Sequence, residues 1–398
     1  MNLGTMAPAA LFIVAACADG ASPDVAYTVS DSAGVTIVES ISPAWNDAQG
    51  WTVGPENTLE IGEASAEEPY VFSQIGGVLQ LSDGRLVVAD GGSSEIRFFD
   101  SDGRFLLAAG REGDGPGEYR VIESLGVGQG DSLWVYDFSL RRITSLAPDG
   151  SLLGTHTLGV ELPTLGAVGR LPDGDFVMAQ FWSSAVAEEG VLGLRRDPVA
   201  YARFSRRGEF VDTIAMLPGR EVVLSDDGGR TVMGAPPFGH TSRHTLSGGR
   251  LYVGSQETFQ IGVYRPNGAL ERLIRIPDMD LAITQEDLAS EKNRRVQGVS
   301  SEDQPGLRTY LDEIETPKTK PAYLHLMVDD GDNLWASEYV PFTDAPERWF
   351  VFNRIGAWLG MVSMPEGFRP HRIADDWILG VRVDDLGVER VVRYRLRT

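Results

Sequence analysis

Short hydrophobic runs alternate with glycine- and aspartate-rich turns along most of this chain, at intervals typical of β-strands. The clearest example is the stretch 72–110, which contains four such runs. Asp83-Gly84 joins the first two runs, and an Asp-Gly pair favours the tight turn of a β-hairpin because glycine tolerates a positive φ angle. The stretch therefore predicts an antiparallel sheet whose strands are Val78 to Leu81, Leu86 to Ala89, Glu95 to Phe99 and Phe105 to Ala108.

The same pattern returns along the chain, with a turn before the second strand and, in every unit but the last, a glycine before the fourth. One such sheet cannot bury both of its faces, so the repeats have to stack on one another, and radial stacking produces a β-propeller. We therefore predict an all-β fold, a six-bladed β-propeller of four-stranded antiparallel blades. A β-sandwich or a β-solenoid is the alternative, although a sandwich does not repeat and solenoid coils lack two hairpin turns per repeat. The predicted units are 72–110, 121–159, 164–216, 241–277, 321–364 and 369–398.

The last unit contains only three predicted strands, so a strand from elsewhere has to complete its sheet. An N-terminal strand that pairs with the C-terminal one removes the exposed edge and closes the ring. The first clear strand is Val35 to Glu39, and we predict that it pairs with Val388 to Leu396. A second short strand, Leu59 to Ile61, is assigned to no unit. Residues 34–398 then form a single propeller domain.

Long connections fall only between the second and third strands of a unit and between consecutive units, so they emerge on one face of the ring. We call this the loop face, and the opposite one, which carries the tight turns, the hairpin face. The longest connection contains helix signals over about 280–316, between blades four and five: Thr284 and Asp287 resemble a capping box, and Leu307, Leu311 and Ile314 fall at helical spacing. We predict a short helical insert that lies over the channel mouth; a peripheral packing insert is the alternative.

Charge and cysteine content change the picture in two ways. The formal net charge of −22 disfavours nucleic acid and anionic lipid headgroups as partners. The single cysteine, Cys17, follows an apolar run that is too short to span a bilayer but is typical of a signal peptide. Residues 14–17 resemble the bacterial lipobox, which implies a signal peptide over 1–17, lipidation of Cys17, a tether over 18–33 and a membrane-anchored protein of the periplasm or cell surface. A buried N-terminal strand is the alternative, because residues 1–6 contain no Lys or Arg.

A glycine-rich connection carries a more specific resemblance. Residues 113–119 read Gly-Asp-Gly-Pro-Gly-Glu-Tyr, after an Ala-Asp that ends a second strand and a Phe-Asp-Ser-Asp-Gly that ends a third. The segment lacks the Lys and Ser or Thr of a phosphate loop, and a strand follows it where a phosphate loop has a helix. It is instead similar to the NHL-related six-bladed β-propeller lipoproteins of bacteria, closely over units one and two. That resemblance implies a six-bladed ring outside the cytoplasm and no particular catalytic residue.

Binding residues concentrate on loops that a rigid scaffold holds, so the loop face is the predicted site. It fits a non-catalytic module that recognises a protein, a peptide or a glycan. Trp182 is the strongest candidate, since aromatic anchors dominate recognition, although it can also fold back on its own loop. Asp90 and Asp137 end second strands and either face a ligand or cap nearby loop amides. The full set of candidates is Trp182, Arg111, Glu118, Tyr119, Asp90, Asp137 and Glu338.

Three of the five histidines occupy the innermost strands of consecutive units. His244, His325 and His371 fall in units four, five and six, where inner strands line the axial channel. Imidazoles from different blades that converge there can bind one ion, so a metal-dependent hydrolase or lyase with zinc or calcium at the channel mouth is the second function class. Packing of these histidines in the channel or between blades is the favoured reading. No other cofactor is predicted.

Overall fold

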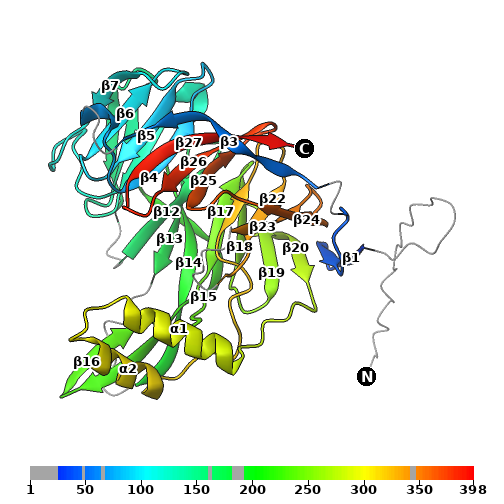
Figure 1. Cartoon of the computed structure of the whole chain (residues 1–398). Coiled ribbons are helices and arrows are strands. Elements are labelled where there is room, and N and C mark those ends of the chain that lie inside the picture. The colour runs from blue at the N-terminus through cyan, green and yellow to red at the C-terminus, as the bar shows by residue number, and fades with distance from the viewer. Residues whose placement is uncertain (1–25, 47–49, 64–67, 160–163, 182–191, 341–346) are drawn as a thin grey trace, which may run out of the picture.

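A computed structural model describes residues 26–46, 50–63, 68–159, 164–181, 192–340 and 347–398. Six antiparallel sheets surround a common axis, and the described residues contain only two α-helices (Figure 1). The first strands of the sheets contact one another in the order β25, β4, β8, β12, β17 and β21, and so are the innermost strands. The prediction of an all-β, six-bladed propeller is confirmed.

In each blade the strands follow one another from the innermost to the outermost. Blade one is β4 (Ile75–Gln80), β5 (Leu86–Asp90), β6 (Glu95–Phe99) and β7 (Phe105–Ala109), and blade two is β8 (Ile122–Val127), β9 (Leu133–Asp137), β10 (Arg142–Leu146) and β11 (Leu152–Thr157). Blade three is β12 (Thr164–Arg170), β13 (Phe176–Phe181), β14 (Gly193–Phe204), β15 (Phe210–Asp227) and β16 (Arg230–Gly234). Blade four is β17 (Arg243–Ser247), β18 (Arg250–Gly254), β19 (Phe259–Tyr264) and β20 (Leu270–Ile276), and blade five is β21 (Leu326–Val328), β22 (Leu334–Ser337), β23 (Arg348–Phe352) and β24 (Trp358–Ser363). Blade six is β25 (Phe368–Ile373), β26 (Trp377–Val383), β27 (Glu389–Arg397) and β3 (Thr52–Ile61).

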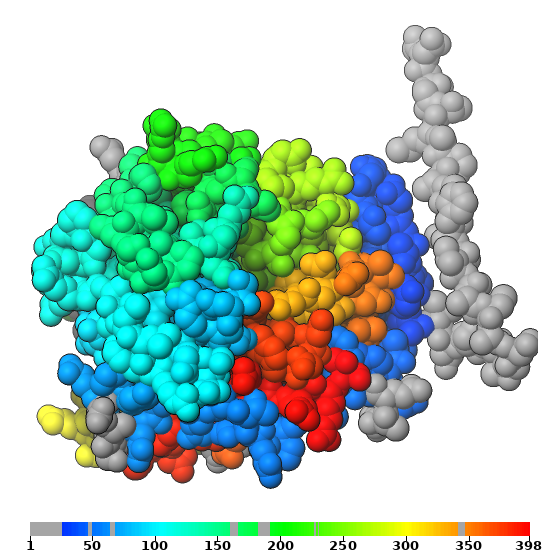
Figure 2. Space-filling model, turned by 90° about the horizontal axis from the view of Figure 1, so that it is seen from above, coloured from blue at the N-terminus to red at the C-terminus, as the bar shows by residue number. Residues whose placement is uncertain are grey.

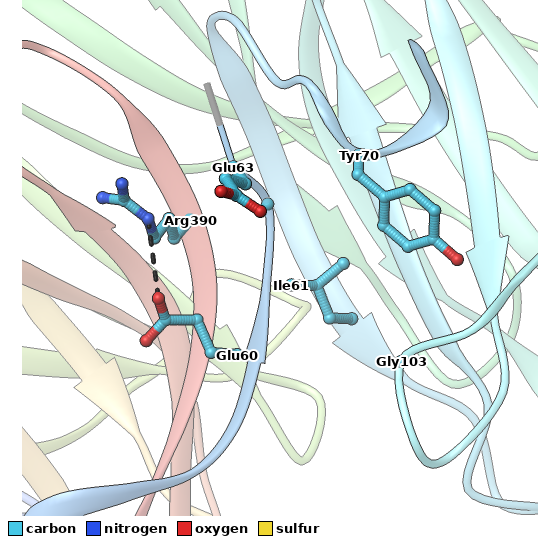
Figure 3. Close-up of a pocket in the computed structure, with 7 residues that line it drawn as sticks. Glu60, Ile61, Glu63, Tyr70, Gly103 and Arg390 are labelled. Atoms are coloured by element: carbon cyan, nitrogen blue, oxygen red, sulfur yellow. Dashed lines mark ion pairs between the residues drawn. The ribbon is translucent and has the colours of Figure 1, made fainter. Parts of the chain in front are cut away.

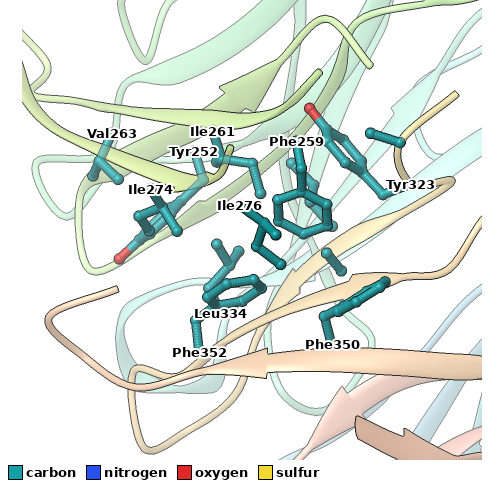
Figure 4. Packing of buried hydrophobic residues seen from close by; sticks show 13 residues of the cluster. Tyr252, Phe259, Ile261, Val263, Ile274, Ile276, Tyr323, Leu334, Phe350 and Phe352 are labelled. Carbon is teal, nitrogen blue, oxygen red and sulfur yellow. The ribbon is translucent and has the colours of Figure 1, made fainter. Parts of the chain in front are cut away.

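The ring is held together by hydrophobic clusters between neighbouring blades. Side chains alternate between the two faces of a strand, so each blade packs against both neighbours. In β5, Leu86 and Val88 pack against blade six, whereas Val87 and Ala89 pack against blade two. The cluster between blades four and five is rich in aromatic rings, with Phe259 at its centre (Figure 4). Both faces of the strand are therefore buried, which explains its continuous hydrophobic run.

Ring closure uses a different strand from the predicted one. β27 pairs antiparallel with β3, with Val391 opposite Ile61 and Arg397 opposite Thr52. The predicted partner lies in β2 (Val35–Ser40), which instead runs parallel to β20 at the outer edge of blade four. An N-terminal strand does complete the last blade, but the prediction that Val35 to Glu39 does so is wrong. The sequence predicts only the end of β3, Leu59 to Ile61, because glutamates and asparagine interrupt the few apolar residues of this strand.

The N-terminal end of the described chain adds one more strand. β1 (Tyr27–Ser32) pairs with β2, so blade four carries two extra strands outside β20. This strand lies inside 18–33, where the sequence predicts a tether. The rest of that tether, the signal peptide over 1–17 and Cys17 lie outside the described residues.

The two helices lie between β20 and β21. They are α1 (Gln285–Gln297) and α2 (Gln304–Glu313), and the capping box of Thr284 and Asp287 is formed in both directions. They lie beside β16, the end of the long hairpin of blade three (Figure 1). Arg295 anchors α1 there, because its guanidinium donates to the carbonyl oxygens of Ala235 at 2.7 Å and Pro236 at 3.1 Å. These contacts tie the insert to the segment between blades three and four, and its position over the channel mouth stays a prediction. In the part of the chain that the structure describes, no helix has the length and apolar character needed to cross a bilayer.

Candidate functional site

The start of β14 lies beside the helical insert. Leu194, in this strand, donates its backbone N–H to the carboxylate of Glu315, just after α2, at 3.4 Å. This end of blade three is therefore on the same face of the ring as the helical insert. Trp182, which belongs to the connection between β13 and β14, lies outside the described residues.

The hairpin face is hollowed where blades two, three and four meet. Figure 2 views the molecule from this side, opposite the helices, and the groove has a volume of about 920 Å³. Glycine-rich turns line it, including Gly174 and Gly249. Its guanidinium groups have acceptors: Arg170 donates to the carbonyl oxygen of Gly174 at 3.2 Å, and Arg206 donates to that of Asp173 at 3.2 Å.

A second groove lies at the outer edge between blades six and one, with a volume of about 680 Å³ (Figure 3). Its charges are paired within the protein. Arg390 lies 3.5 Å from Glu60 and 2.7 Å from Asp384. The named arginines of both grooves thus have hydrogen-bond or ion-pair partners within the protein.

Asp90 is a structural residue. It is 1% exposed at the end of β5, and its carboxylate accepts hydrogen bonds from the backbone N–H of Ser73 at 3.0 Å and the hydroxyl of Ser93 at 3.0 Å. It also forms an ion pair with Arg97 at 3.1 Å, and both side chains are buried. The capping alternative therefore describes Asp90, and its assignment as a ligand contact is wrong.

Asp137 occupies the equivalent place in blade two. It is fully buried, and its carboxylate accepts from the backbone N–H groups of Arg120 at 2.6 Å, Val121 at 3.1 Å and Leu140 at 2.8 Å. A carboxylate with three donors has little capacity left for a ligand. This assignment as a ligand contact is corrected for the same reason.

Three other candidates, Arg111, Glu118 and Tyr119, lie in the connection 110–119, and they differ in exposure. Arg111 is an exposed loop residue whose guanidinium donates to Glu118 at 2.8 and 2.6 Å. The Gly115 backbone N–H, and then Arg111, hold the pKa of Glu118 below its usual range. Tyr119 is 1% exposed and packs in the cluster between blades one and two, against Gly110, and burial raises its pKa to about 12. Its prediction as a surface contact is wrong, because the aromatic ring anchors the loop.

Glu338 remains a candidate on the loop face. It follows β22, and its two carboxylate oxygens accept from Arg348 at 2.7 Å each. A paired carboxylate of this kind can still face a ligand with its outer edge, since a quarter of the side chain is exposed. Arg111, Glu118 and Glu338 therefore stay as predicted contacts.

The three histidines lie in or directly beside inner strands, as predicted. His244 is the second residue of β17, His325 directly precedes β21, and His371 lies in β25. Burial lowers the pKa of each imidazole to about 4, and nearby guanidinium groups add to this effect: Arg243 for His244, Arg243 and Arg369 for His325, and Arg369 for His371. His325 is nevertheless exposed to solvent, which weakens the effect of burial on its pKa.

These histidines do not assemble into a metal site. Within the described ranges, no three His, Cys, Asp or Glu side chains are grouped so that they could hold an ion. His244 turns toward blade three, where its Nδ1 lies 3.1 Å from the hydroxyl of Tyr201. The predicted convergence on one ion is therefore not found among these residues.

Arginines near the histidines were missed by the sequence reasoning. Arg243 begins β17, is half-buried, and has a buried Nε without a hydrogen-bond partner among the described residues. Burial lowers its pKa, and the positive charge of Arg220 lowers it further. The sequence signal for this residue is the pair Arg243-His244 at the start of an inner strand. We call Arg220, Arg243 and Arg369 with the three histidines the channel-mouth cluster.

The lowered histidine pKa values predict acid sensitivity. The unfolded chain binds protons at these sites below pH 6.5 and the folded chain only near pH 4, so stability is fully present above pH 6.5 and falls as the pH drops from 6.5 to 4. For His244 the loss is at most about 3 kcal/mol, and solvent contact reduces it. Urea unfolding across this range should show a shallower pH slope for His244→Gln than for the wild type. His156→Gln, at an exposed position in β11, is the control, and an equal slope in all three proteins would contradict the prediction.

Comparisons with known proteins support the fold. A family described as a 6-bladed beta-propeller, DUF5128, matches residues 67–168. A DUF4221 member from Bacteroides vulgatus is 11% identical, with 87% of this chain and 99% of that chain covered and a TM-score of 0.51. A candidate exported protein from Bacteroides fragilis is 11% identical, with coverage of 86% and 97% and a TM-score of 0.48. Virginiamycin B lyase from Staphylococcus aureus is 11% identical, with coverage of 88% and 100% and a TM-score of 0.43. No curated protein matches. At these identities the similarities concern the fold alone.

Proposed function

We propose that the protein is an extracytoplasmic binding module that recognises a protein, peptide or glycan ligand on its loop face. One observation carries this proposal. The helical insert and the long hairpin of blade three are both built on the loop face, whereas the first and second strands of each blade are joined by short turns on the other face. Elaboration of one face of a rigid ring is typical of a recognition surface.

A metal-dependent hydrolase or lyase remains the alternative, but nothing specific favours it. The described residues offer no metal-binding group, and the virginiamycin B lyase similarity is too weak to transfer an activity. Among the candidate carboxylates, Asp90 and Asp137 are buried and Glu118 and Glu338 are paired with arginines. At these residues, binding by shape and hydrogen bonding is better supported than acid-base chemistry. Metal analysis of the purified protein tests the alternative, which requires retained zinc or calcium.

Two exposed arginines allow the two faces to be compared directly. Arg111 lies on the loop face with 79% of its side chain exposed, and Arg104 lies in a hairpin-face turn with 75% exposed. The wild type and both charge-reversal variants are screened on peptide and glycan arrays, and the affinity for each captured ligand is then measured in solution. We expect Arg111→Glu to weaken binding about tenfold or more, as loss of a charged contact does, and Arg104→Glu to leave it unchanged. Binding that depends on Arg104 alone, or no captured ligand, would contradict the proposal.

The location of the protein outside the cytoplasm is part of the same proposal. We expect export, lipidation of Cys17 and attachment to the membrane only through that lipid. The lipobox-like residues 14–17 support this assignment. Mass spectrometry of the N-terminal peptide from membrane-extracted protein tests it, and a mature N-terminus other than an acylated Cys17 would refute it.

A further inference from the structure

We infer that the channel-mouth cluster binds the anionic group of a small molecule, a carboxylate or a phosphate, through the guanidinium of Arg243. This inference rests on the proposed function, because the site lies on the loop face and would hold the charged part of its ligand.

Arg243 is the centre of the proposed site. Its Nε is buried, and the described residues provide it with neither a hydrogen-bond acceptor nor a carboxylate at ion-pair distance. A buried donor that lacks an acceptor costs about 1–3 kcal/mol, and more for a charged group, so such a position calls for a partner that binds there. An oxyanion is the best acceptor for a guanidinium, because two oxygens can accept from it side by side.

The charged groups that surround Arg243 do not neutralise it. Arg220 adds a second positive charge, and the remaining ionisable neighbours that affect Arg243 are Tyr201 and Tyr323, which are neutral at physiological pH because burial raises their pKa. Arg369 extends the positive region across the mouth to blade six, although Glu389 partly compensates it at 3.2 Å. The imidazoles stay neutral above about pH 4 and can donate hydrogen bonds without changing the charge.

This positive region stands out against the rest of the protein. The chain has a formal net charge of −22, and most of its other arginines form ion pairs with aspartate or glutamate. A protein of that charge repels anions in general, so a local group of arginines that carboxylates compensate only in part selects an anion at one place. The arginines of the hairpin-face groove are different, because their guanidinium groups already donate to backbone carbonyls.

Sulfate, inorganic phosphate and succinate serve as probes, and chloride at equal ionic strength serves as the reference. Calorimetric titration and thermal unfolding are measured for the wild type, Arg243→Gln and the control Arg104→Gln. We expect saturable binding of one anion per chain and a higher Tm in its presence. The affinity should fall at least tenfold in Arg243→Gln and stay unchanged in Arg104→Gln. Sulfate and phosphate binding without succinate binding would assign the site to phosphate-type groups, and the reverse would assign it to carboxylates.

Two results would overturn the inference: no effect of any probe beyond that of chloride, or equal binding by the wild type and Arg243→Gln, which would mean an adventitious ion only. If Arg243→Gln fails to fold, Arg369→Gln provides the second variant, for which a smaller loss of affinity is expected because Glu389 compensates that residue. Failure here is distinguishable from failure of the proposed function. Array ligands that depend on Arg111 can exist without an anion site, and sulfate can bind at Arg243 in a protein that captures no array ligand.

Discussion

A protein that begins at residue 62 is expected to lose cooperative folding, whereas one that begins at residue 42 is expected to keep it. The first truncation removes β3, which pairs with β27 and places Leu59 and Ile61 in the cluster between blades six and one. Loss of this strand exposes the edge of β27 and opens that cluster, which removes a large part of the ~5–15 kcal/mol that stabilises a typical domain. The second truncation removes only β1 and β2 from the outside of blade four.

Size-exclusion chromatography and thermal unfolding distinguish these outcomes. The protein from residue 42 should be monomeric with a Tm lower by a few degrees, and the protein from residue 62 should aggregate or unfold without a sharp transition. A synthetic peptide of residues 50–63, added in trans, should restore part of the lost stability. An unchanged Tm for the protein from residue 62 would show that β3 does not close the ring.

Replacement of Asp90 by alanine is expected to destabilise the protein by about 3–5 kcal/mol, because it leaves a charged partner buried. Arg97 has 3% of its side chain exposed and would retain only Glu95, at 3.0 Å, as an ion-pair partner. The N–H of Ser73 and the hydroxyl of Ser93 would also lose their acceptors. Urea unfolding measures the change.

The matched control is Asp83→Ala, in the exposed turn of the same blade, where the ion pair with Arg85 is half exposed. A change below about 1 kcal/mol is expected there, as for most exposed ion pairs. The double variant Asp90→Ala, Arg97→Met should regain part of the lost stability, because it removes the unpaired charge. Equal stability of Asp90→Ala and the wild type would contradict a structural role for Asp90 and would make it a candidate ligand contact again.

The fold was predictable because the same pattern of turns and hydrophobic runs recurs from blade to blade. Turns such as Asp83-Gly84, whose glycine has a φ of 91°, mark the hairpins, and alternating hydrophobic positions mark the blades. The closing strand was not predictable, because pairing between β3 and β27 spans more than 300 residues and leaves no local pattern. β2 has the stronger strand signal, yet that signal says nothing about which edge the strand joins.

The candidate site was predictable only in part. Strand position places His244, His325 and His371 at the channel mouth, but it does not reveal that His244 turns toward Tyr201. Asp90, Asp137 and Tyr119 are polar residues next to predicted loops, so the sequence makes them candidates for a ligand contact. The structure shows that all three are buried, the two carboxylates as hydrogen-bond acceptors and the Tyr119 ring in a hydrophobic cluster. Arg243 was missed for the converse reason, since the lack of a partner is a property of three-dimensional surroundings and not of sequence.

The most direct test of the proposed binding surface is a crystal structure of the protein soaked in selenate, whose anomalous scattering locates the anion. The account predicts a difference peak within hydrogen-bond distance of the Arg243 guanidinium at the loop-face end of the channel, and no such peak in crystals of Arg243→Gln. A peak confined to the hairpin-face groove beside Arg170 and Arg206, with an empty channel mouth, would contradict it.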